Sequence, residues 1–102
     1  MAKSIMQTDK EHCYLCGRNS HADYFGLDEH HVFGGYGIRK LSEKYGLKVY
    51  LCHNDCHEYG ENAVHRNAEV DLMLKQKAQK KAMKHYGWSV EDFIDIFGKN
   101  YL

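Results

Sequence analysis

The 102-residue chain contains no proline and carries no net charge, because fourteen basic residues balance fourteen acidic ones. It also has no long apolar run, and its mean hydropathy is -0.67, so it contains no candidate for a membrane-spanning helix. Without proline, internal repeats or low-complexity stretches, the sequence gives no sign of a domain boundary. Zero net charge indicates no class of partner, so any charged partner would be recognised by a local cluster of side chains.

The first twelve residues have neither the apolar stretch nor the small-residue cleavage site of an export signal. We therefore expect a cytoplasmic protein, with residues 1–12 forming a flexible arm before a single domain over residues 13–102. In a reducing cytosol, cysteines that occur in close pairs favour metal binding over disulfides. A domain of this size has a thin core, and a bound metal is one way to stabilise it.

Four cysteines form two closely spaced pairs, with two residues inside the first pair and three inside the second. A glycine directly follows the first pair and permits the positive φ of a zinc knuckle, a turn whose backbone amides face the thiolates. Two such pairs supply the four thiolates of a tetrahedral structural zinc site. The predicted zinc ligands are Cys13, Cys16, Cys52 and Cys56.

Two segments between the cysteine pairs have the features of β-strands. Residues 27–33 form a short run that ends at a glycine pair. Residues 47–51 have an alternating pattern that includes β-branched and aromatic side chains. Between them, residues 38–45 have apolar residues at helical spacing, and Gly46 follows as a helix end. The sequence therefore predicts a β-hairpin whose connection contains a helix.

Helices are predicted after the second cysteine pair. Asn67 can cap a long helix that continues to Tyr86 and ends at Gly87. Ser89 begins a capping-box pattern that opens a further helix over residues 90–97.

Together these elements predict the α+β fold class, with a small zinc-stapled hairpin core over residues 13–67 and C-terminal helices over residues 67–98. The last helix and the residues after it are rich in aromatic side chains, including Phe93, Phe97 and Tyr101. Two roles are open for this tail. It can pack on the long helix, or it can form a homodimer through the C-terminal helices.

The lysines of the long predicted helix are unevenly distributed. Residues 75–85 contain five lysines and no acid, and four of these lysines fall on one helical face. Such a face can bind the phosphates of a nucleic acid or can simply be a solvated helix surface. The four candidate nucleic-acid contacts are Lys77, Lys80, Lys81 and Lys84.

Two adjacent histidines lie between the cysteine pairs, and another histidine directly follows the second pair. With the two knuckles, the glycine pair and the hairpin, this pattern over residues 13–67 resembles the HNH nucleases, also called ββα-metal or His-Me finger nucleases. The C-terminal sequence looks like that of small phage-encoded proteins of this type. The matching residues are Cys13, Cys16, His30, His31, Gly34, Gly35, Leu51, Cys52, Cys56 and His57.

The resemblance implies a ββα-metal core and a DNA endonuclease that is phage or prophage encoded and acts in the cytosol of a bacterial host. A histidine suits the general base that deprotonates water, and by position this base is His31. A divalent cation neutralises charge that develops on the phosphate, and by position His30 and His57 hold it. His65, eight residues after His57, is the preferred third ligand, and His53 is the alternative.

Three imidazoles without an assured carboxylate favour Mn²⁺, Ni²⁺, Co²⁺ or Zn²⁺ over Mg²⁺ as the catalytic ion. Asp28 or Glu29 can accept the N–H of a liganding histidine and so fix its tautomer. The chain departs from the family at Leu47, where members carry an asparagine that helps to orient the base, and in the three-residue spacing of the second cysteine pair. A second hypothesis is therefore a non-catalytic, zinc-stabilised module that binds nucleic acid or protein.

Overall fold

The computed structural model describes residues 3–19, 26–61 and 63–102. A two-stranded antiparallel hairpin is followed by helices, which confirms the predicted α+β fold class. None of the helices in these described ranges is long and apolar enough to cross a membrane. The elements occur in the order β1 (Leu27–His31), α1 (Ile38–Tyr45), β2 (Lys48–Cys52), the π-helical turn η2 (His53–Glu58), α2 (Ala68–Tyr86) and α3 (Val90–Phe97).

The register of the hairpin separates the two adjacent histidines. His30 lies opposite Val49, and His31 lies opposite Lys48. Because successive side chains of a strand point to opposite faces, Asp28 shares the face of His30 and Val49, whereas His31 and Lys48 share the other face. Val49 is fully buried, so the face that carries Asp28 and His30 is the one turned toward the core.

The first strand ends at His31, two residues before the predicted end at Phe33. The hydroxyl of Ser42 in α1 donates to the carbonyl of Phe33 at 2.7 Å and accepts its N–H at 3.0 Å. These bonds take the place of strand pairing and turn the chain from the sheet toward α1. The ring of Phe33 then contacts Phe93 and Phe97 in α3, with ring centroids 5.5 and 4.9 Å apart.

The helix boundaries agree with the capping residues predicted from the sequence. Gly46 ends α1 in the left-handed region with φ of 72°. The side chain of Asn67 accepts two backbone N–H groups in the first turn of α2. Ser89 and Asp92 form the reciprocal bonds of a capping box at the start of α3.

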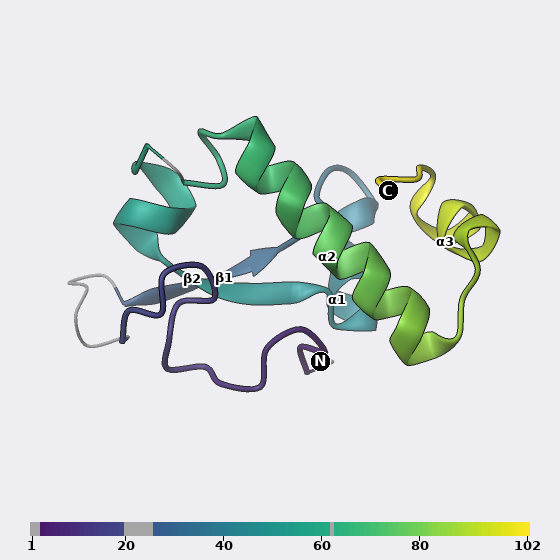
Figure 1. The fold of residues 1–102 in the computed structure, drawn as a ribbon, viewed down its shortest axis with the longest axis horizontal. Helices are drawn as coiled ribbons and strands as arrows, with labels where there is room; N and C mark the ends of the chain where they lie inside the picture. The colour runs from purple at the N-terminus through teal and green to yellow at the C-terminus, as the bar shows by residue number, and fades with distance from the viewer. Residues whose placement is uncertain (1–2, 20–25, 62) are drawn as a thin grey trace.

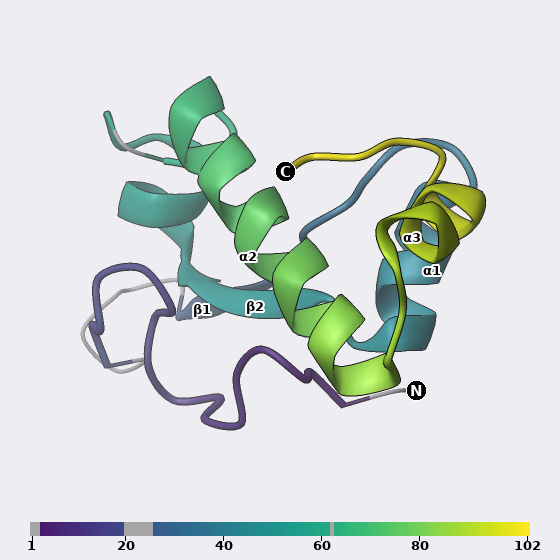
Figure 2. The same cartoon turned by 45° about the vertical axis from the view of Figure 1, so that its right-hand side comes forward.

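The long helix α2 crosses the hairpin, and α3 returns beside α1 at one end of the molecule (Figures 1 and 2). Phe93 and Phe97 are buried in this arrangement, so the aromatic tail packs into the core. A homodimer through the C-terminal helices stays a prediction, with Ile94 and Leu102 among the exposed apolar residues. The side chains buried between the hairpin and the helices include Val49, Leu51, Leu74, Ala78, Ala82 and Phe93.

Part of the segment predicted as a flexible arm lies beside β2. The N–H of Ile5 donates to the carbonyl of Gly46 at 2.9 Å, and the hydroxyl of Ser4 donates to the carbonyl of Lys48. The N–H of Tyr50 donates to the side-chain oxygen of Gln7 at 2.8 Å. Because Tyr50 is in β2, the segment occupies hydrogen-bonding positions at the outer edge of that strand.

Candidate metal centres

The four predicted cysteines lie together, with their sulfur atoms all within 4.8 Å of one another. Cys52 is the last residue of β2, and Cys56 lies one turn further on in η2. The sulfurs of Cys16 and Cys52 are 3.8 Å apart, which is the separation of two sulfurs on a tetrahedral zinc with bonds of about 2.3 Å. The cluster is therefore consistent with a structural Zn²⁺.

The first knuckle is built to hold a thiolate. Gly17, with φ of 75°, closes the turn by donating its N–H to the carbonyl of Cys13 at 2.9 Å. Burial opposes ionisation of the Cys13 thiol, but the backbone N–H groups of Cys16 and Cys52 contribute to a net lowering of its pKa to about 7. Burial raises the pKa of both Cys52 and Cys56. Four thiolates at this spacing repel one another, so a bound cation is needed to hold all four in the ionised form.

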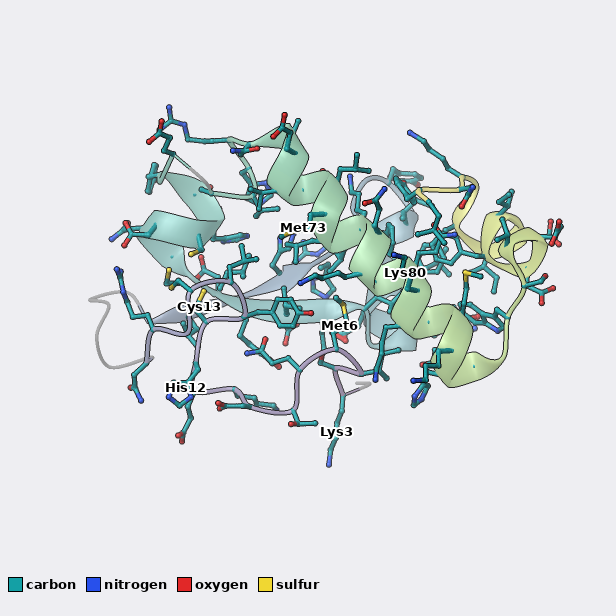
Figure 3. The ribbon with its side chains drawn as sticks, in the orientation of Figure 1. Lys3, Met6, His12, Cys13, Met73 and Lys80 are labelled. Carbon is teal, nitrogen blue, oxygen red and sulfur yellow. The ribbon has the colours of Figure 1, made fainter. Side chains whose placement is uncertain are left out.

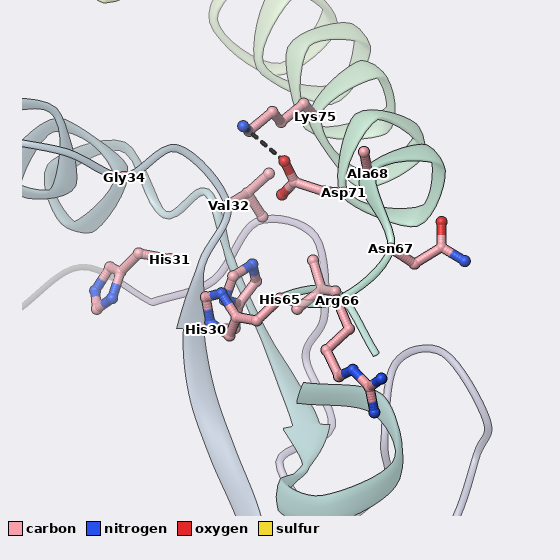
Figure 4. A pocket seen from close by; sticks show the side chains of 11 residues that line it. His30, His31, Val32, Gly34, His65, Arg66, Asn67, Ala68, Asp71 and Lys75 are labelled. Carbon is pink, nitrogen blue, oxygen red and sulfur yellow. Dashed lines mark ion pairs between the residues drawn. The ribbon is translucent and has the colours of Figure 1, made fainter. Parts of the chain in front are cut away.

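Three histidines form a second cluster at the inner face of the hairpin. One ring nitrogen from each of His30, His57 and His65 lies within 4.8 Å of the others. The Nε2 atoms of His57 and His65 are 3.0 Å apart, and the His30 ring centroid is 5.1 and 5.3 Å from those of His57 and His65. Figure 4 shows the rings of His30 and His65 beside each other, and their planes meet at 85°. The preferred third histidine thus joins the other two.

The environment of His30 fits a bound cation. Its Nε2 is buried and has no hydrogen-bond partner within the part of the chain that the structure describes. A buried polar atom without a partner is unfavourable. Burial is the main cause that lowers the pKa of His30 to about 3, and the neighbouring His57 and His65 lower it further. At neutral pH the imidazole is uncharged, and its lone pair is available to a metal.

Asp28 connects this cluster to η2. Its Oδ2 atom accepts from Nδ1 of His53 at 2.5 Å and from Nδ1 of His57 at 2.7 Å. These are hydrogen-bond distances, so the three groups form a hydrogen-bonded set in this structure. Because His57 donates through Nδ1, its Nε2 keeps a lone pair that faces His65.

His53, the alternative third ligand, does not belong to the cluster of His30, His57 and His65; it hydrogen-bonds to Asp28. Burial raises the pKa of Asp28, but the hydrogen bonds from His53 and His57 outweigh burial and hold the pKa below its ordinary value. Asp28 is therefore a carboxylate at neutral pH, as an acceptor of two N–H groups requires.

His65 reaches the cluster through a reversal of the chain, although the eight-residue spacing would place it two helical turns after His57 if the segment between them were helical. After η2 the chain reverses, and the N–H groups of Val64 and His65 donate to the carbonyls of Cys56 and His57 at 2.8 and 3.3 Å. The turn passes through Gly60, where an added Cβ would lie 2.0 Å from the carbonyl oxygen of Asp55. Only glycine fits this close approach, and the reversal brings His65 back beside His57.

His31 lies on the other side of β1 from His30, as Figure 4 shows. Even so, both residues line one cavity of about 290 Å³, together with His57, His65 and Arg39. The cavity includes both faces because β1 ends at His31 and the chain turns away immediately afterward. The predicted base and the predicted metal ligands therefore share a space, although they project from opposite faces of the strand.

His31 has three charged neighbours. Arg39 in α1 donates its Nε–H to Nδ1 of His31 at 3.3 Å, which leaves the proton of a neutral imidazole on Nε2. Nε2 lies 3.6 Å from Glu29 and 3.5 Å from Glu43. The hydrogen bond from Lys48 is the main cause that holds the pKa of Glu43 below its ordinary value. Arg39 and Glu43 were not predicted from the sequence. The feature that could have indicated them is their four-residue spacing, which places both on one face of α1.

The four predicted nucleic-acid lysines lie on one exposed face of α2. They line a groove with Met6 and Tyr14, and Figure 3 shows Lys80 and Met6 on neighbouring segments. We call this surface the lysine groove; its residues are Met6, Tyr14, Lys77, Lys80, Lys81 and Lys84.

A scan against protein-family models finds no match for this chain. Searches of the curated proteins and of the solved structures also find no similar protein. The comparisons assign no family, and the geometry establishes a hairpin with cysteine and histidine clusters that are able to bind metal.

Replacing Cys16 by serine should unfold the protein. Structural zinc in small domains contributes about 10–16 kcal/mol of apparent binding energy, which exceeds the usual net stability of about 5–15 kcal/mol. Circular dichroism with metal analysis should show lost zinc and lost structure for Cys16→Ser, whereas His31→Ala stays folded. Equal thermal stability of the two variants would show that the cysteine cluster is not the scaffold.

Replacing Asp28 by alanine should weaken metal binding at the three histidines by about 10- to 100-fold, because His57 loses the acceptor that fixes its tautomer. Calorimetric titration of protein with a filled cysteine site measures this affinity. Glu58→Gln is the matched control, since a Glu58 oxygen lies 3.4 Å from the same nitrogen of His57. An equal loss in both variants would contradict a specific role for Asp28.

We expect the natural protein to bind two metal ions per chain and the variant Gly60→Ala to bind one. The added Cβ would lie 2.0 Å from a backbone oxygen, so the turn must open and His65 must leave the cluster. Gly34→Ala is the control, because an added Cβ there meets nothing within 4 Å. Metal analysis after dialysis gives both counts, and two ions retained in Gly60→Ala would argue against this turn as the element that positions His65.

Proposed function

We propose that this protein is a metal-dependent endonuclease that hydrolyses phosphodiester bonds in DNA. One observation carries the proposal: three mutually close imidazoles, one with a buried unpartnered nitrogen, share a cavity with a fourth histidine. The first three have the chemistry of a cation site, and the fourth has that of a proton acceptor. Hydrolysis of a phosphodiester requires both functions within reach of one phosphate.

The residues that would hold the ion are His30, His57 and His65. A divalent ion held there supplies positive charge to the phosphate oxygens and to the departing oxygen. Asp28 keeps the Nε2 lone pair of His57 directed into the cluster. Burial keeps His30 uncharged, so that it does not repel the ion.

His31 accepts the proton of the attacking water in this proposal. The carboxylates of Glu29 and Glu43 lie near Nε2, so the proton of the neutral ring stays there and Nδ1 is the basic atom. Arg39 donates to Nδ1 and lines the same cavity. When the guanidinium of Arg39 pairs with a phosphate of the substrate, Nδ1 becomes free to accept a proton from water.

The carboxylates of Glu29 and Glu43 can also replace the asparagine that helps to orient the base in the HNH nucleases and that this chain lacks. Leu47 stands at that position and is fully buried in the core, so it has no part in orienting the base. Glu29 and Glu43 are placed to orient His31 instead, one from the same strand and one from α1. Both carboxylates lie beside Nε2, away from the proposed basic atom Nδ1, and Glu29 also lines the cavity.

A second candidate function is a non-catalytic module, stabilised by zinc, that binds nucleic acid or protein. The contact between Arg39 and His31 favours it, because the nitrogen that would accept a proton already has a donor. Both candidates use the same cysteine cluster as a scaffold, since fold and activity are separable.

A plasmid-nicking assay distinguishes the two functions. For the nuclease, His31→Ala should reduce the cleavage rate by about 10²- to 10⁴-fold while the fold and both metal sites remain, because only the proton acceptor is lost. The exposed His85 on α2 provides the control, and His85→Ala should cut at the natural rate. Intact DNA binding without cleavage by the natural protein, under any divalent ion, would support the module.

The choice of ion is a separate expectation. Three imidazole ligands should make Mn²⁺, Ni²⁺, Co²⁺ or Zn²⁺ better activators than Mg²⁺, which prefers oxygen ligands and retained waters. Initial cleavage rates across this series, at equal ion concentration, measure the order. A rate that is highest with Mg²⁺ would mean that carboxylates such as Asp28 bind the ion directly.

A further inference from the structure

The lysine groove, of about 460 Å³, carries positive charge without local compensation. Lys77, Lys80, Lys81 and Lys84 are exposed, and none forms an ion pair within the described ranges. By contrast, Lys75 on another face of α2 pairs with Asp71 at 2.8 Å. Four ammonium groups without an acidic partner among the described residues favour a polyanion over a single small anion.

An aromatic ring lies at the edge of the same groove. The ammonium of Lys77 is 5.9 Å from the centroid of the Tyr14 ring, and Tyr14 is held to β2 by an N–H bond to the carbonyl of Tyr50 at 2.8 Å. An aromatic ring beside a row of lysines is the combination that binds single-stranded nucleic acid, because unpaired bases stack on the ring while phosphates meet the cations. An acidic peptide would use the lysines but would leave the ring without a flat partner.

The lysine groove and the cluster of His30, His57 and His65 lie on opposite sides of α2. Asp71 and Lys75 line a cavity of about 500 Å³ together with His30 and His65. Nine residues separate Lys75 from Lys84, which is about two and a half helical turns, so these two side chains leave α2 in opposite directions. Duplex DNA has a persistence length of about 150 base pairs and cannot curve around one helix of about 10–12 Å diameter at modest cost.

We infer that the lysine groove binds a nucleic-acid segment other than the one placed at the histidine cavity, so that one protein molecule holds two segments at once. The inference rests on the proposed function, because that function is what places a DNA segment at the histidine cavity. It narrows the substrate class to DNA that offers an unpaired strand close to a duplex, such as a branched molecule with a single-stranded arm.

A capture assay tests the inference without requiring cleavage. Short duplexes on beads are incubated with His31→Ala protein, a labelled single-stranded oligonucleotide is added, and the retained label is measured. The test variant is Lys80→Glu with Lys84→Glu, and the control is Lys44→Glu with Lys99→Glu, which makes the same charge change at exposed lysines elsewhere. We expect at least a tenfold loss of captured label in the test variant and little change in the control.

Cleavage of a short linear duplex is measured in parallel, with the same substitutions in protein that keeps His31. Lost capture with unchanged cleavage supports two separate segments. Parallel loss of capture and cleavage would show that the groove holds the segment being cut, and equal capture by test and control variants would show that the groove binds no nucleic acid. Either result overturns the inference. Absence of cleavage in the natural protein would reject the nuclease proposal alone, because capture is still measured.

Salt dependence gives an independent readout of the groove. Four lysine contacts with phosphates predict a slope of about -3 in a plot of log affinity against log salt concentration for a single-stranded oligonucleotide. The oligonucleotide is titrated into His57→Ala protein, in which the histidine cluster is incomplete. A slope near zero, or binding unchanged by Lys80→Glu with Lys84→Glu, would also overturn the inference.

Discussion

The approach of the first cysteine pair to the end of β2 is the contact on which the rest of the structure depends. A two-stranded hairpin is only marginally stable in water, and this sheet has no third strand among the described residues. The sulfur cluster joins the knuckle at residues 13–16 to the last residue of β2 and to η2. It thereby fixes the direction in which the chain leaves the sheet, and that direction decides where the next histidines lie.

The fold was largely predictable because its boundaries are set by local chemistry. Gly46, Asn67 and Ser89 each act on the nearest turn of a helix, so their sequence neighbours contain the relevant information. The end of β1 was placed at Phe33 and lies at His31, because the competing partner of Phe33 is the Ser42 hydroxyl nine residues away. Such a partner becomes visible only when α1 is packed.

The sequence indicated which histidines form the cluster, but not how the chain brings them together. The proximity of His65 to His57 follows from a reversal at Gly60, whereas the eight-residue spacing gave two helical turns only if the segment between them were helical. The neighbours of His31 come from α1 and from the cross-strand Lys48, which no motif predicts. Side-chain alternation correctly separated His30 from His31, but it gave no hint that the cavity would extend around the end of the strand.

Cys56 and His57 are neighbours in the chain, yet one belongs to the sulfur cluster and the other to the imidazole cluster. A single peptide bond thus links the two clusters. A metal ion that gathered the thiolates would also fix the position of His57 and so prepare the imidazole cluster to bind a second ion. Oxidation of the thiols would remove the ligands of the first ion, so metal binding at the histidines would depend on the redox state of cysteines that do not touch that second ion.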